Sequence, residues 1–147
     1  MYAMLCPRPD ICYSIGMVSR YQTNSGPKHW QVVKQILKYL RRMRDYMLIY
    51  QCEDLIPISY TNSDFQPDLN FRKSTSGYVF TLGGGAISWR SVKQSYIADS
   101  IMEVEYVAAC EAAKEAVWLQ NFLSDLGVVR MEQVLITLFC NNSGVVA

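Results

Sequence analysis

The sequence predicts a mixed α/β fold (α+β), on three observations that follow one another along the chain. Two stretches near the start carry apolar residues at helical spacing. From residue 55, three short β-rich stretches follow, separated by turn residues. A long helical stretch then leads to one more β-rich stretch. The predicted order is therefore a small helical segment, followed by strand, strand, strand, helix and strand.

The helical segment is predicted from its start, its stop and its apolar stripe. Residues 9–10 (Pro-Asp) open a first helix, since proline is tolerated in a first turn. Residues 24–27 (Asn-Ser-Gly-Pro) end that helix, and a second helix runs from 27 to 42. Its apolar residues recur three and four positions apart: Trp30, Val33, Ile36, Leu37 and Leu40. Residues 46–52 are β-rich and predict a strand.

The first three strands of the sheet are predicted from alternation and turns. Residues 55–64 alternate apolar and polar side chains, and Pro57 belongs at an edge or at the strand start, because it has no N–H for the ladder. Residues 78–82 and 86–89 form a hairpin around three glycines at 83–85.

The second half of the sheet unit is organised by one long helix. Residues 94–99 are either a further short strand or an extended lead into this helix, which we expect over 101–126. Trp89 and Trp118 are expected in the core. Residues 133–140 are predicted to form the last strand.

Composition limits the class of protein. Of 147 residues, 50% are hydrophobic and 18% charged, which favours a folded chain. No apolar run reaches the roughly 18 residues that a membrane span needs, so we expect no membrane partner. His29 is the single histidine, which disfavours a zinc site. Five cysteines without a close pair predict free, mostly buried thiols and an intracellular, cytoplasmic or nuclear location: Cys6, Cys12, Cys52, Cys110 and Cys140.

Charge is distributed unevenly along the chain. Residues 1–50 hold eight Lys/Arg and two Asp, a net charge of +6, whereas residues 51–147 hold six Lys/Arg and eleven Asp/Glu, a net charge of −5. With a turn at Glu53-Asp54, this split predicts two pieces, 1–52 and 53–147. Three cations at the end of the second helix have two interpretations, contacts to nucleic-acid phosphates or a solvated helix face: Lys38, Arg41 and Arg42.

Polar residues stand at the ends of two predicted strands, at 61–64 and 140–142, and the long helix begins with Glu103 and Glu105. Polar strand tips beside a helical carboxylate predict a metal-dependent site. Simpler roles stay open for the same residues. The glutamates favour the positive end of the helix dipole, and the asparagines, including Asn142, are good turn and cap residues.

Several of these stretches resemble one known family. Residues 72–78 (Arg-Lys-Ser-Thr-Ser-Gly-Tyr), the glycine hairpin ending in Ile-Ser-Trp at 87–89, and residues 103–108 and 111–115 are similar to the ribonuclease H domain of copia-type retrotransposon polyproteins. The first 50 residues resemble the end of the reverse transcriptase region that precedes it, through three stretches: residues 8–11, 18–20 and 29–40.

The resemblance implies a ribonuclease H-like mixed sheet, with the family's remaining C-terminal elements absent after Ala147. It divides the chain into a helical tail of reverse transcriptase, 1–52, and a truncated ribonuclease H-like domain, 53–147. It also implies a Mg²⁺-dependent endoribonuclease that cuts the RNA of an RNA–DNA hybrid. Such chemistry needs several carboxylates that converge on two metal ions.

The chain departs from the family where those carboxylates belong. Asn62 and Asn141 stand at two of the family's metal positions, and Glu105 is the one expected acid that is clearly present. Asp64 is the alternative ligand, although in a strand it lies about 6.6–6.8 Å from residue 62. We therefore expect a copy that binds Mg²⁺ weakly and is inactive. The alternatives are an active hybrid ribonuclease that uses Asp64 and Glu105, or a repurposed module that binds nucleic acid or protein.

Overall fold

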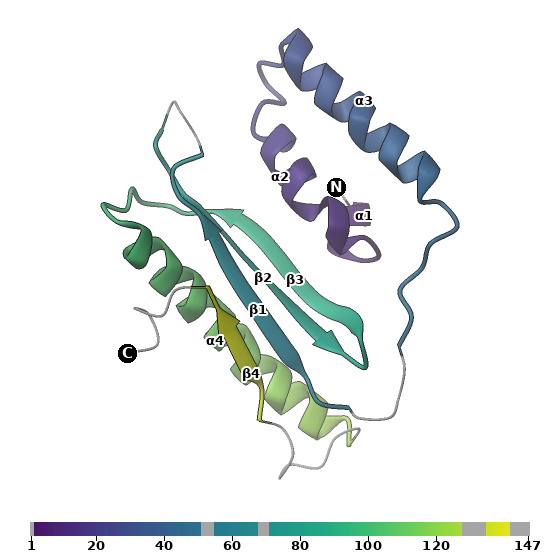
Figure 1. The fold of residues 1–147 in the computed structure, drawn as a ribbon, viewed down its shortest axis with the longest axis vertical. Coiled ribbons are helices and arrows are strands. Elements are labelled where there is room, and N and C mark those ends of the chain that lie inside the picture. Colours follow the sequence, from purple (N-terminus) through teal and green to yellow (C-terminus); the bar gives the residue numbers. More distant parts are fainter. Residues whose placement is uncertain (1, 51–54, 68–70, 128–134, 142–147) are drawn as a thin grey trace. The chain divides into compact units, whose positions relative to one another are not determined.

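The computed structural model describes residues 2–50, 55–67, 71–127 and 135–141. The chain forms two compact units, Met1–Leu48 and Ile49–Ala147. In these described ranges the first unit is helical, and the second contains a four-stranded sheet and one long helix. Figure 1 shows how the helix lies along the sheet. The predicted mixed α/β class is confirmed. No helix in the described part of the chain combines the length and the apolar character that crossing a membrane requires.

The helical unit contains α1 (Tyr2–Leu5), the 3₁₀-helix η1 (Pro9–Ile11), α2 (Cys12–Ser19) and α3 (Pro27–Arg42). The bounds of α3 are those predicted. The predicted first helix begins instead with one 3₁₀ turn, a common start for a helix, and ends at Ser19. The apolar stripe of α3 faces α2 across an apolar groove of about 500 Å³.

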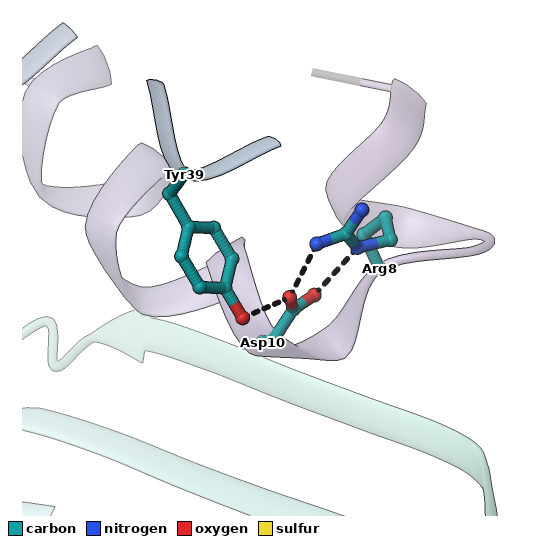
Figure 2. A network of polar contacts seen from close by, with 3 residues as sticks. All are labelled: Arg8, Asp10 and Tyr39. Carbon is teal, nitrogen blue, oxygen red and sulfur yellow. Dashed lines mark hydrogen bonds and ion pairs between the residues drawn. The ribbon is translucent and has the colours of Figure 1, made fainter. Parts of the chain in front are cut away.

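A polar network joins residues 8–10, called here the N-terminal turn, to α3 (Figure 2). The Arg8 guanidinium donates from Nε to Asp10 Oδ1 over 2.9 Å and from Nη2 to Asp10 Oδ2 over 2.6 Å. The Tyr39 hydroxyl donates to the same Oδ2 over 2.7 Å. These hydrogen bonds, the pair from Arg8 foremost, lower the pKa of Asp10 to about 2. The network therefore fixes α3 to the N-terminal turn through one ionised carboxylate.

The sheet has the strand order β3-β2-β1-β4. Strand β1 (Ile58–Asp64) pairs antiparallel with β2 (Thr75–Leu82), and β2 pairs antiparallel with β3 (Gly85–Lys93). Strand β4 (Thr137–Cys140) pairs parallel with β1. The β2–β3 turn contains Gly83 and Gly84, both at positive φ, which glycine adopts without steric cost. Both hairpin strands are longer than predicted.

Helix α4 (Ile101–Asp125) covers one face of the sheet. Small residues of α4, Ala108 and Ala112, are buried and let the helix lie close to the strands. Phe80 of β2 is fully buried, and Ser88 of β3 donates to Glu115 of α4 over 2.7 Å. The core of this unit therefore lies between α4 and the sheet.

Some expectations about elements are wrong. Residues 46–50 form no strand, and 51–52 lie outside the described residues. Of the two alternatives for residues 94–99, the strand is not formed, and these residues are a loop with bends that leads into α4. Trp118 is 55% exposed and stacks on Phe122 rather than packing in the core, because α4 turns that side of the helix to solvent. Trp89 is half-buried.

The cysteines of the described residues are free. Cys12 is buried, Cys6 is exposed, and Cys110 and Cys140 are half-buried. Cys52 lies outside the described residues. The prediction that these thiols are mostly buried therefore holds only for Cys12.

Candidate functional site

The two polar strand tips lie side by side because β1 and β4 are parallel neighbours. Thr61 is in register with Cys140, so the next residues, Asn62 and Asn141, follow at adjacent positions. Asn141 Nδ2 donates to Asn62 Oδ1 over 3.4 Å. The same Oδ1 accepts from the backbone N–H of Ser63 over 2.9 Å. The strand tips are thus joined by a neutral amide pair.

Glu105 lies in the second turn of α4 and is 6% exposed. Its Oε2 is buried and has no hydrogen-bond partner among the residues that the structure describes. Cys140, the last residue of β4, lies within the electrostatic reach of this carboxylate. Burial, and then the charge of Glu105, raise the pKa of the Cys140 thiol. Cys140 is therefore protonated at neutral pH and does not add a negative charge to the site.

Glu103 has a structural role. The Ser100 hydroxyl accepts from the backbone N–H of Glu103 over 3.2 Å, and Glu103 Oε2 accepts from the backbone N–H of Asp99 over 3.0 Å. These reciprocal bonds cap the start of α4. The simpler interpretation of this acid as a first-turn residue is therefore supported.

Asp64 ends β1 on the same face as Asn62, and both residues are exposed. Two residues along a strand span about 6.6–6.8 Å, so Asp64 cannot take the place of Asn62 without rebuilding the strand end. Asn142 lies outside the described residues.

The donor set does not fit two Mg²⁺ ions. Mg²⁺ takes anionic oxygen in near-octahedral geometry. Here the strand tips offer amides, and Asn62 Oδ1 already accepts two hydrogen bonds. Within the described ranges, no group of three or more His, Cys, Asp or Glu is placed to hold a metal ion.

The cations with two predicted interpretations, nucleic-acid contact or a solvated helix face, lie on α3 of the helical unit. Lys38, Arg41 and Arg42 are exposed, and α3 contains no Asp or Glu. Across the part of the chain that the structure describes, no ion pair involves these three residues. Their charge is therefore available to an anionic partner.

One feature of the sheet was not predicted from the sequence, an aromatic pair on neighbouring strands. The rings of Tyr60 and Phe139 stack with centroids 5.3 Å apart, on the face of the sheet away from α4. The signal was the alternation along β1, which places Tyr60 on the same face as Asn62. The position of Phe139 depends on the β1–β4 pairing, which local patterns do not reveal.

Comparison with known proteins finds several retrovirus-related Pol polyproteins of transposons. The chain is 44% identical over 146 residues to the retrovirus-related Pol polyprotein from transposon TNT 1-94 of Nicotiana tabacum, which is 99% of this chain and 11% of that protein. It is 30% identical over 138 residues to the Pol polyprotein from transposon RE2 of Arabidopsis thaliana, which is 93% of this chain and 9% of that protein. The chain thus spans about a tenth of the length of these polyproteins.

A shorter relative also aligns. The secreted RxLR effector protein 161 of Plasmopara viticola is 42% identical over 120 residues, which is 81% of this chain and 84% of that protein. No protein-family model and no solved structure matches the chain. The identities with the transposon polyproteins extend over both units, and their names agree with the motifs of the sequence. The chain belongs to the retrovirus-related Pol polyproteins of copia-type transposons.

Proposed function

We propose that the chain combines the helical tail of a reverse transcriptase region, residues 1–52, with a ribonuclease H-like domain, residues 53–147. Two observations support this division. The mixed sheet with one helix on its face is the arrangement expected for a ribonuclease H-like domain. The compact units also separate at residues 48–49, close to the proposed boundary.

We further propose that this copy does not hydrolyse RNA–DNA hybrids. The main support is the amide pair of Asn62 and Asn141, which are hydrogen-bonded over 3.4 Å. The resemblance places metal-binding carboxylates of the family at these two positions. Two neutral amides and one buried glutamate provide too little negative charge to hold two divalent cations. Mg²⁺ is therefore bound weakly at most, and the reaction lacks both its nucleophile activation and its leaving-group stabilisation.

Nucleic-acid binding is the proposed remaining activity. Lys38 and Arg41 lie three positions apart on one side of α3, with Arg42 beside them in the last turn. Exposed cations on a helix that contains no Asp or Glu attract phosphate backbones, with an affinity that falls as salt rises. Free cysteines in the described part of the chain are compatible with the proposed intracellular, cytoplasmic or nuclear location.

The test is cleavage of a labelled RNA–DNA hybrid by the full chain in Mg²⁺ and in Mn²⁺. We expect no cleavage above the buffer control in either metal, and hybrid binding that weakens with salt. Cleavage that Glu105→Ala abolishes, while the control Glu111→Ala retains it, would contradict the inactive copy. Glu111 is a suitable control because it lies on the same helix and pairs with Lys114 at the surface.

The same assay separates the two alternatives. An active enzyme with a displaced site would lose cleavage with Asp64→Ala as well as with Glu105→Ala. A repurposed protein-binding module would show neither cleavage nor salt-dependent binding to the hybrid.

A further inference from the structure

The face of the sheet opposite α4 carries two exposed aromatic side chains on the neighbouring strands β1 and β4. Along β1, Ser59 and Thr61 are buried toward α4, whereas Tyr60 and Asn62 point to the other face and are exposed. The register places Phe139 of β4 beside Tyr60. Tyr60 is 49% exposed and Phe139 is 51% exposed, and their rings stack 18° from parallel. The open face thus carries one partly exposed aromatic stack, whose outer ring surfaces remain accessible.

The amide pair lies one row further along the same strands. Asn62 follows Tyr60 by two residues, and Asn141 follows Phe139 by two residues. Within the described residues, Asn62 Nδ2 and Asn141 Oδ1 take part in no hydrogen bond. The pair therefore presents one free amide donor and one free amide acceptor next to the rings. Beyond Asn62 the row continues with Gly77, which has no side chain to fill the surface.

The charge of this face permits an anionic strand to approach. With amides instead of carboxylates, the second row carries no charge. The third row contains Asp64 on β1 and Lys93 on β3, in register through Thr75, so that the two formal charges offset. The formal charges of the side chains in these rows therefore offset.

We propose that this open face binds an unpaired nucleobase of a single-stranded nucleic acid. The base stacks on the Tyr60–Phe139 rings, and its edge forms hydrogen bonds with the Asn62–Asn141 amides. Exposed aromatic side chains on a sheet stack unpaired bases, and a side-chain amide matches the donor and acceptor pattern of a base edge. The inference rests on the proposed nucleic-acid function for the class of ligand, but it uses residues other than those of α3.

The first experiment needs no variant. The full 147-residue chain is titrated into a labelled single-stranded RNA octamer, and into the same octamer with its four central nucleotides abasic, at one salt concentration. Because the two strands carry the same phosphates, the difference reports contacts to bases. We expect the intact octamer to bind about tenfold tighter or more. Equal affinities would overturn the proposal.

The second experiment locates the contact. Tyr60→Leu and Phe139→Leu should each weaken binding of the intact octamer by about fivefold or more, and should leave the abasic octamer unaffected. Phe122→Leu is the matched control, since Phe122 belongs to a second exposed stack, with Trp118 on α4. An equal loss with Phe122→Leu would overturn the assignment. A change in the sedimentation coefficient with Tyr60→Leu or Phe139→Leu would also overturn it, because this face would then join copies of the chain. Far-UV circular dichroism tests whether each variant folds. If a variant does not fold, the comparison of intact and abasic octamers on the unchanged chain still tests the proposal.

The variant Lys38→Ala/Arg41→Ala/Arg42→Ala distinguishes this proposal from the proposed function. Loss of the α3 cations should weaken both octamers by the same factor. If that variant has no effect while the intact octamer still binds more tightly than the abasic one, the α3 proposal fails and the nucleobase site stands. If the triple variant weakens both octamers equally, and the unchanged chain binds the two octamers with equal affinity, the α3 proposal stands and the nucleobase site fails.

Discussion

Asn141 Nδ2 donates to Asn62 Oδ1 over 3.4 Å, so that the ends of the parallel strands β1 and β4 are joined by two uncharged amides. In the transposon polyprotein family to which the chain belongs, the resemblance places carboxylates at both positions. Two carboxylates at this distance would repel each other unless a cation lay between them. The amide pair holds the strand tips together without such an ion.

The double variant Asn62→Asp/Asn141→Asp should therefore make stability depend on divalent cations. Without metal, like charges on neighbouring strands should lower the free energy of unfolding by about 1 kcal/mol. Millimolar Mg²⁺ should recover part or all of this loss, because a cation between the two carboxylates offsets their repulsion. Thermal unfolding with EDTA and with Mg²⁺ measures the effect. The control is Asn121→Asp on the exposed side of α4, for which Mg²⁺ should change nothing. An equal response in both variants would mean that the strand tips form no cation site even with carboxylates.

Glu105 and Cys140 give a prediction about thiol reactivity. The Glu105 charge is the second cause, after burial, of the raised pKa of Cys140. Glu105→Gln removes that charge, so the pKa of Cys140 should fall but stay above the ordinary value of 9.0. The pH dependence of alkylation at Cys140, followed by mass spectrometry, measures this shift, and alkylation at pH 8 should become faster. Glu111→Gln serves as control. An unchanged profile at Cys140 would show that the two groups do not interact.

The core between α4 and the sheet gives a prediction about stability. Phe80 is fully buried, so Phe80→Ala should cost about 3–5 kcal/mol, from lost burial and the cavity that remains. Phe122→Ala removes the same ring from a half-exposed surface stack and should cost about 1 kcal/mol. Urea unfolding followed by far-UV circular dichroism compares the two. Similar costs would contradict the placement of the core on the α4 face.

The elements that the sequence predicted well are those with strong local signals. The bounds of α3 follow from Pro27 at its start and an apolar stripe along its length, and α4 ends one residue before the predicted position. The strand predicted at residues 46–50 is wrong, because this β-rich stretch pairs with no other strand in the described part of the chain and a strand needs a partner. The site divides in the same way. Alternation along β1 places Tyr60, Asn62 and Asp64 on one face, but their neighbours come from β4, almost 80 positions later, and only the tertiary pairing supplies them.

The network of Arg8, Asp10 and Tyr39 predicts how the helical unit responds to acid. The pKa of Asp10 is lowered from 3.8 to about 2, first by the Arg8 hydrogen bonds. Because the pKa of the folded state is the lower one, the stabilisation is fully present above about pH 4 and is lost as the pH falls toward 2. The Asp10 side chain is 34% exposed, so solvent screening limits the effect to about 1 kcal/mol or less. Asp10→Asn should therefore be less stable than the unchanged chain at pH 6, and most of the difference should be lost by pH 2. Urea unfolding at pH 6, 4 and 2 measures this difference, with a carboxyl chemical-shift titration to report the pKa of Asp10 directly.

Asp45→Asn is the control, since the pair of Asp45 with Arg44 is over three-quarters exposed and should contribute little to stability at any pH. A difference for Asp10→Asn that stays constant down to pH 2 would show that the carboxylate charge does not hold α3 to the N-terminal turn.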